Sequence, residues 1–268
     1  MESRERSVVQ LRGMDWSYAI VPTAALGASL LTFISGFGLG TLLLPVFALF
    51  FPLDMSVLLT AVVHLLNNLF KLGLLWKSVD KRTVLLFGVP GIVGAFGGAW
   101  LLDQLGALEP LYQGVRVPVD AVRIGIAVLM VLFAITEMLP SVSGFSFHPK
   151  FLLPGGLFSG FFGGFSGHQG ALRTMFLLRC GLTKEALIAT GVAIACLVDF
   201  TRIPMYAASP LGSSVRSQWP LLVLATAAAF VGAYWGKRLI PKVTMRGVQL
   251  LVAAFMVVIA VGLAAGAL

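Results

Sequence analysis

Residues 155–173 read GGLFSGFFGGFSGHQGALR, and residues 35–45 read SGFGLGTLLLP. Each stretch places several glycines inside a long apolar segment. Because glycine has no Cβ and a low helix propensity, each stretch is predicted to end one helix and to begin another. The second helix of each pair is expected to begin near Gly40 or Gly170. The sequence therefore predicts two places where a helix breaks and restarts within an apolar layer.

The composition is that of a protein that spans a lipid bilayer. Hydrophobic residues make up 58% of the 268 residues and charged residues 11%, with a mean hydropathy of +0.96. A soluble domain carries about 25% charged residues and could not cover its surface with so few. The net charge of +8 is spread in small clusters between apolar segments. Such clusters set membrane topology, and without a basic stripe they do not indicate nucleic-acid binding.

The two breaks belong to a longer internal repeat. A shift of about 130 residues superposes Gly40 on Gly170, and both halves show the order broken pair, long helix, long helix, final helix. With each broken stretch counted as two helices, an all-α membrane protein of about ten helices is predicted. The predicted organisation is an extramembrane segment at 1–15, transmembrane repeats at 16–140 and 150–268, and a linker at 141–149.

The basic residues predict that the two repeats are inverted. The loop at 77–82 carries Lys77, Lys81 and Arg82, whereas its counterpart at 207–212 carries no basic residue. The pattern is reversed in the loop before the last helix. That loop is basic, whereas its counterpart in the first half of the chain is mainly acidic. Because Lys and Arg mark the cytoplasmic side, equivalent loops are expected to face opposite sides of the membrane, with both termini outside.

Broken helices in inverted repeats are a recurrent plan of secondary transporters, with the substrate site at mid-membrane between the repeats. Unwound backbone survives in hydrocarbon only where protein or a water-filled cavity covers it. A restarting helix presents free N–H groups and the positive end of its dipole, which favour an anion. We therefore expect the two breaks to meet at mid-membrane and to bind a small anion. The predicted substrate-binding residues are Gly38, Gly40, Thr41, His168, Gln169, Gly170 and Arg173.

Arg173 has two interpretations. It lies one turn into an apolar helix, where a buried cation is costly and needs a partner or a task. Its planar guanidinium suits the paired oxygens of a sulfonate, sulfite or carboxylate. The first interpretation is contact with the substrate, and the second is a structural ion pair with Asp199 on a neighbouring helix.

Other polar residues occur at helical spacing. His64, Asn67, Asn68 and Lys71 fall at i, i+3, i+4 and i+7 and are predicted to form one polar stripe toward the protein interior. Lys71 is expected to extend toward the cytoplasmic interface near Trp76.

Two pairs of residues have structural interpretations. Asp199 and Arg202 are spaced i, i+3 and are predicted to neutralise each other. Asp54 and Thr183 precede long helices and are predicted to be N-caps. The predicted gating or ion-pair residues are His64, Asn68, Asp199 and Arg202.

The chain resembles the sulfite exporter TauE/SafE family over nearly its whole length. The resemblance rests on the motifs at 35–45 and 155–173, each followed by a long helix such as IATGVAIACLVDFTR at 188–202. The first half keeps the glycines and Pro45 of the family's pattern, whereas the second has Ser-Gly-His-Gln-Gly, with Met175 near the expected proline. The resemblance implies a multi-pass transporter of sulfite or organosulfonates in the bacterial inner membrane. It implies no covalent reaction.

Export is the predicted direction. Moving one negative charge outward down an inside-negative potential releases about 2.3 kcal/mol per 100 mV, so no coupling ion is needed. An anion channel and a proton-coupled importer of carboxylates or sulfonates are the alternatives. The sequence has no HExxH or CxxC motif and no histidine cluster, so neither an enzyme, a cofactor nor a metal site is predicted. Whether the protein forms a homodimer stays open.

Overall fold

The structure is a computed structural model that describes residues 16–31, 39–138, 146–208, 215–239 and 245–268. Most of these residues are helical, and the described strands are two residues long each, β1 (Tyr112–Gln113) and β2 (Pro118–Val119). The prediction of an all-α membrane protein is confirmed. The predicted segment 1–15 and residue Gly38 lie outside the described residues.

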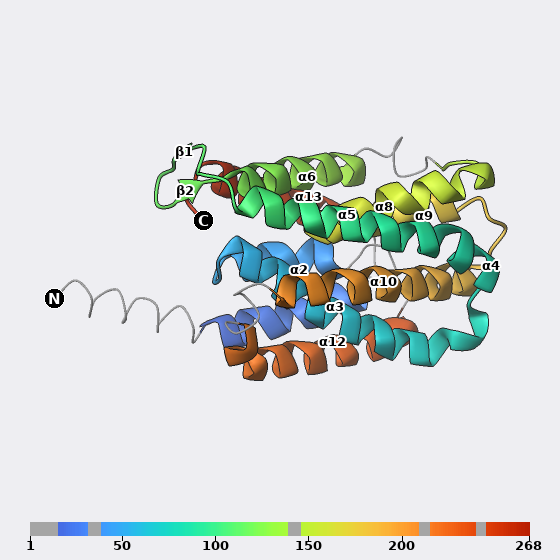
Figure 1. Ribbon diagram of the computed structural model, residues 1–268. Coiled ribbons are helices and arrows are strands. Elements are labelled where there is room, and N and C mark those ends of the chain that lie inside the picture. Colours follow the sequence, from blue (N-terminus) through green and yellow to red (C-terminus); the bar gives the residue numbers. More distant parts are fainter. Residues whose placement is uncertain (1–15, 32–38, 139–145, 209–214, 240–244) are drawn as a thin grey trace.

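The helices follow the same order of lengths in both halves (Figure 1). The first half contains the apolar helix Trp16–Leu31, α2 (Leu39–Ala48), α3 (Leu53–Leu75), α4 (Lys81–Thr83), α5 (Val89–Gly106) and α6 (Ala121–Met138). The second half contains α8 (Leu152–Ser166), α9 (Gly170–Leu177), α10 (Lys184–Ala207), α12 (Trp219–Leu239) and α13 (Met245–Ala264). Among the described residues, four helical segments are long and apolar enough to cross a membrane: Leu53–Ser78, Lys81–Gly106, Lys184–Ala207 and Trp219–Gly236.

The second helix break lies where glycine permits a left-handed backbone. Helix α8 continues through Ser166 and ends at Gly167, which has φ +81°. A residue with a Cβ is strained in this conformation, so glycine is the usual residue at such a helix end. Helix α9 begins at Gly170, which confirms the second predicted restart, whereas the residues before Leu39 of α2, where the first break is predicted, lie outside the described residues.

Helices α3 and α10 lie side by side in the middle of the bundle and run in opposite directions (Figure 1). At one end, Ser78 donates a hydrogen bond to Glu185 at 2.9 Å, and the amide of Asp80 donates to the Thr190 hydroxyl at 2.9 Å. At the other end, the first residues of α3 and the last residues of α10 line one cavity. Inverted repeats require this antiparallel arrangement of equivalent helices.

Glycines bring helices from the two halves into backbone contact. A Cβ on Gly94 or Gly98 of α5 would overlap the backbone of α8. A Cβ on Gly156, Gly160 or Gly164 of α8 would overlap the backbone of α5 or of the turn that precedes it. In the same way, a Cβ on Gly232 of α12 would overlap the backbone of Leu26. Such close approach between apolar helices depends on small residues. Each half therefore contributes one long helix that is interlocked with the first helix of the other half.

Of the two predicted N-caps, one is confirmed and one is wrong. Thr183 precedes α10, and its side chain accepts a hydrogen bond from the Ala186 amide at 3.2 Å. Helix α3 already begins at Leu53, after Pro52, so Asp54 lies inside the first turn. Proline suits this position because it has no N–H to leave unsatisfied at a helix start.

Candidate functional site

The start of α2 lies against the break between α8 and α9. A Cβ on Gly40 would lie 3.3 Å from the carbonyl oxygen of Gly167 and 3.7 Å from Cγ2 of Thr60 on α3. Thr41, the next residue of α2, is 5% exposed. The structure therefore brings Gly40 and the second break together, as the sequence predicts.

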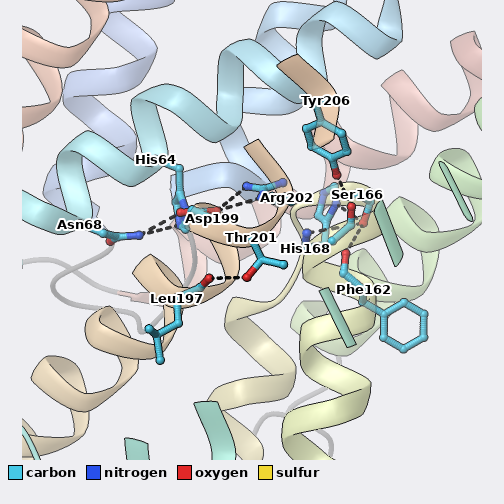
Figure 2. A network of polar contacts seen from close by, with 11 residues as sticks. His64, Asn68, Phe162, Ser166, His168, Leu197, Asp199, Thr201, Arg202 and Tyr206 are labelled. Carbon is cyan, nitrogen blue, oxygen red and sulfur yellow. Dashed lines mark hydrogen bonds and ion pairs between the residues drawn. The ribbon is translucent and has the colours of Figure 1, made fainter. Parts of the chain in front are cut away.

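The residues that follow Gly167 form a buried polar cluster. His168 is 2% exposed, Gln169 1% and Arg173 7%. His168 contacts the Ser166 hydroxyl through Nδ1 at 3.2 Å, as Figure 2 shows. Within the described protein, His168 Nε2, both amide atoms of Gln169 and Arg173 Nη1 have no hydrogen-bond partner. Buried polar atoms are normally hydrogen-bonded, and each orphaned group costs about 1–3 kcal/mol. The cluster can therefore supply several hydrogen bonds to a further group.

Arg173 lies against α10 where a glycine leaves room for it. A Cβ on Gly191 would be 3.3 Å from Nε of Arg173. The alternative ion pair of Arg173 with Asp199 is not formed in the structure, and among the described residues Arg173 forms no salt bridge. The reason is that other residues occupy both oxygens of Asp199. Arg173 is therefore not held by a direct ion pair with Asp199 in this structure.

Asp199 is the centre of a buried network that joins α3 to α10 (Figure 2). Its Oδ2 lies 2.6 Å from Nδ1 of His64, and its Oδ1 accepts from Nε of Arg202 at 2.9 Å, with Nη2 at 2.8 Å. Asn68 contacts the His64 ring at 3.2 Å. Asp199 and Arg202 are fully buried. The predicted Asp199–Arg202 pair is confirmed, and His64 is a hydrogen-bonded interior residue.

The polar stripe of α3 faces the protein interior, as predicted. His64, Asn67, Asn68 and Lys71 are each at most 5% exposed. The prediction that Lys71 extends to the interface is wrong, because the side chain finds a polar partner inside. With its amide oxygen facing Lys71, Asn67 accepts from Nζ at 3.1 Å and donates to Ser29.

The buried charges of the described residues are predominantly positive. Lys71, Arg173 and Arg202 are buried cations, whereas Asp199 is the one buried carboxylate in the described part of the chain. Buried charge is costly unless it is compensated, so this region favours a group that carries negative charge.

Sequence reasoning missed two residues of this region. The Thr60 hydroxyl is buried near Gly40 and has no hydrogen-bond partner within the described protein. The Tyr206 hydroxyl donates to the carbonyl of Gly164 on α8. A signal for Tyr206 exists in the sequence, because Asp199, Arg202 and Tyr206 repeat the i, i+3, i+7 spacing of the stripe on α3.

A family model described as sulfite exporter TauE/SafE matches residues 21–263. The match includes both glycine-rich breaks, the buried network and the long helices of both halves. No curated protein matches the chain.

Proposed function

The chain belongs to the sulfite exporter TauE/SafE family, a family of membrane transporters, and from this premise we propose that it exports a small sulfur-containing anion. The anion is sulfite or an organosulfonate, and the membrane is the bacterial inner membrane, which the chain crosses several times. The transport step involves no covalent reaction, cofactor or metal ion.

The orphaned donors beside the helix restart carry this proposal. Gln169 immediately precedes α9 and Arg173 lies one turn further along the helix, and both side chains are buried. A sulfite or sulfonate group offers three oxygens, and a guanidinium binds two oxygens of such a group in parallel. The N-terminus of α9 adds backbone N–H groups and the positive end of a helix dipole. These groups all favour an oxyanion over a neutral or cationic solute.

The excess of buried cations over buried carboxylates supports the same substrate class. Arg202 is neutralised by Asp199, whereas Arg173 forms no salt bridge among the described residues, so the charge of Arg173 is available to a bound anion. Outward movement of a monoanion is favoured by about 2.3 kcal/mol per 100 mV of inside-negative potential. Export therefore proceeds without a coupling ion.

The two-repeat arrangement belongs to this proposal. Residues 16–140 and 150–268 form inverted repeats that are joined by the linker at 141–149 and place the substrate between them. Three observations support the arrangement: the same order of helix lengths in both halves, the antiparallel packing of α3 and α10, and the crosswise glycine contacts. Transporters built in this way bind substrate where the repeats meet.

Thermal unfolding of the purified protein with candidate anions tests the proposal. Sulfite, sulfoacetate, taurine, sulfate and acetate are added separately to wild type, to Arg173→Gln and to the control Arg82→Gln, whose guanidinium is exposed. A ligand at 100 times its Kd stabilises the folded protein by about 2.7 kcal/mol. We expect sulfite or sulfoacetate to stabilise wild type and Arg82→Gln, and to stabilise Arg173→Gln only at concentrations at least about tenfold higher.

Flux measurements complete the test. Proteoliposomes loaded with the stabilising anion should release it faster with wild type than with Arg173→Gln, and an imposed potential that is negative inside should accelerate release. Equal stabilisation of wild type and Arg173→Gln would remove Arg173 from the binding site. A protein that no anion stabilises would refute the proposed substrate class.

A further inference from the structure

A cavity of about 770 Å³ opens at the end of the bundle where α3 begins and α10 ends. Its charged lining residues are Asp54 at the start of α3, Asp103 near the end of α5, and Asp120 and Arg123 at the start of α6. Asp54 and Asp103 are exposed, so the cavity reaches the surface. Tyr206 of α10 also lines the cavity.

The cavity mouth carries net negative charge. Arg123 pairs with Asp120 at 2.6 Å, which leaves the carboxylates of Asp54 and Asp103 uncompensated by the other lining residues. Exposed basic residues gather at the opposite end of the bundle: Lys77, Lys81, Arg82, Lys150, Arg179 and Lys184. Because basic loops mark the cytoplasmic side, the cavity faces outward.

Tyr206 separates this cavity from the helix break. The residue is 6% exposed, and its hydroxyl donates to the carbonyl of Gly164 on α8. Figure 2 shows the hydroxyl directed toward the turn that carries Ser166 and His168. One turn earlier on α10, the guanidinium of Arg202 lies so close to Gly167 that a Cβ at Gly167 would be 3.0 Å from it. The aromatic ring therefore has the cavity on one side and the polar cluster on the other.

The same helix connects the cavity to Arg173. Tyr206, Arg202 and Asp199 follow one another at one-turn intervals, and Gly191, which contacts Arg173, lies further along α10. This part of α10 spans about 22 Å at 1.5 Å per residue. An anion that leaves Arg173 along α10 meets the pair of Asp199 and Arg202 and then Tyr206 before it reaches the cavity.

We propose that the cavity is the outer vestibule of the transport path and that Tyr206 is the gate at its floor. This inference rests on the proposed function and adds the route and the gate. The carboxylates at the mouth repel a released anion, so they favour its departure and oppose its return. The hydroxyl of the gate donates a hydrogen bond to a backbone carbonyl, which a rotation of the side chain breaks.

Cysteine accessibility tests the gate without measuring transport. In a background with Cys180→Ser and Cys196→Ala, one reporter is Ala107→Cys in the exposed cavity wall, and the other is Ser166→Cys behind Tyr206. A membrane-impermeant, sulfonated methanethiosulfonate is applied from the outside. We expect Ala107→Cys to react quickly and Ser166→Cys to be protected. Adding Tyr206→Ala should accelerate modification of Ser166→Cys at least tenfold, whereas Tyr206→Phe, which keeps the ring, should accelerate it less than threefold.

The outcomes separate this inference from the proposed function. An unchanged rate at Ala107→Cys shows that each variant is folded and that the cavity is open. Rapid modification of Ser166→Cys with Tyr206 present, or continued protection in Tyr206→Ala, would overturn the gate. Failure of Ala107→Cys to react from outside would overturn the vestibule. If the labelling pattern holds while no anion stabilises the protein, the substrate assignment is refuted and the gated cavity stands.

Discussion

Replacing Gly160 by alanine tests the backbone packing of α8 on α5. A Cβ on Gly160 would meet the carbonyl oxygen of Gly91 and lie 2.6 Å from its Cα and 2.7 Å from its carbonyl carbon. Carbon atoms in contact lie about 3.5–4.0 Å apart, so the helices must separate by about 1 Å. Overpacking costs about 1–3 kcal/mol, and the higher helix propensity of alanine offsets about 0.5–1 kcal/mol of it. The expected net loss of stability is about 1–2 kcal/mol.

Gly73→Ala is the matched control, because nothing lies within 4 Å of a Cβ at Gly73 on α3. Only the propensity term applies there, so Gly73→Ala should stabilise the protein by about 0.5–1 kcal/mol. Wild type and both variants are unfolded by heat in the same detergent, with tryptophan fluorescence as the signal. If Gly160→Ala is as stable as Gly73→Ala, the backbone contact between α5 and α8 does not exist as described.

Three further changes probe the buried charges and one surface cap. Asp199→Asn leaves Arg202 buried without its counter-charge and should lower the free energy of unfolding by about 3–5 kcal/mol. Adding Arg202→Met to this variant should recover part of that stability, and no recovery would contradict the pairing. Lys71→Met should weaken stabilisation by the dianion sulfate about tenfold more than stabilisation by the monoanion methanesulfonate, and equal losses would exclude Lys71 from the site. Hydrogen bonds from Thr83 hold the pKa of Asp80 below its usual value. The ionised carboxylate of Asp80 therefore stabilises the folded protein at neutral pH, and this stabilisation disappears as the pH falls through the lowered pKa. Asp80→Asn should therefore lower the melting temperature at neutral pH and leave it unchanged in acid, and a loss that is independent of pH would count against this role.

The helix breaks could be predicted from the sequence because they depend on local chemistry. Gly167 takes a positive φ that other residues adopt with strain, and the apolar segments on both sides are long enough to form helices. The polar stripe of α3 was predictable for the same reason, since helical spacing alone places His64 and Lys71 on one face. In these cases, a few consecutive residues contain all the information that the prediction needs.

Contacts between distant helices were not predictable in the same way. Asp199 had two guanidinium groups as candidate partners, Arg202 on its own helix and Arg173 on another. The near partner occupies one oxygen and His64 from α3 occupies the other, so Arg173 remains with orphaned donors. Periodicity reveals which side chains share a face, but it does not reveal which helix packs against that face. The role of Gly160 was missed for the same reason.

The crosswise glycine contacts restrict how the molecule can move. Helix α5 is interlocked with α8, and α12 with the helix Trp16–Leu31, so the two predicted repeats cannot shift past each other as rigid bodies without breaking both contacts. Helix α10 packs on α5 and on the turn before it, where Leu197 approaches Gly88, and α3 packs on α12, where Phe70 stacks on Phe230 at 4.6 Å.

Helices α3 and α10 in turn pack against each other, so they connect these interlocked pairs. The pair of His64 and Asp199 joins the two helices at 2.6 Å, and Arg202 shares the same carboxylate. An anion that drew Arg202 away from Asp199 would leave the one buried carboxylate of the described chain less compensated. Because this carboxylate joins α3 to α10, such a loss would weaken the contact between the two helices.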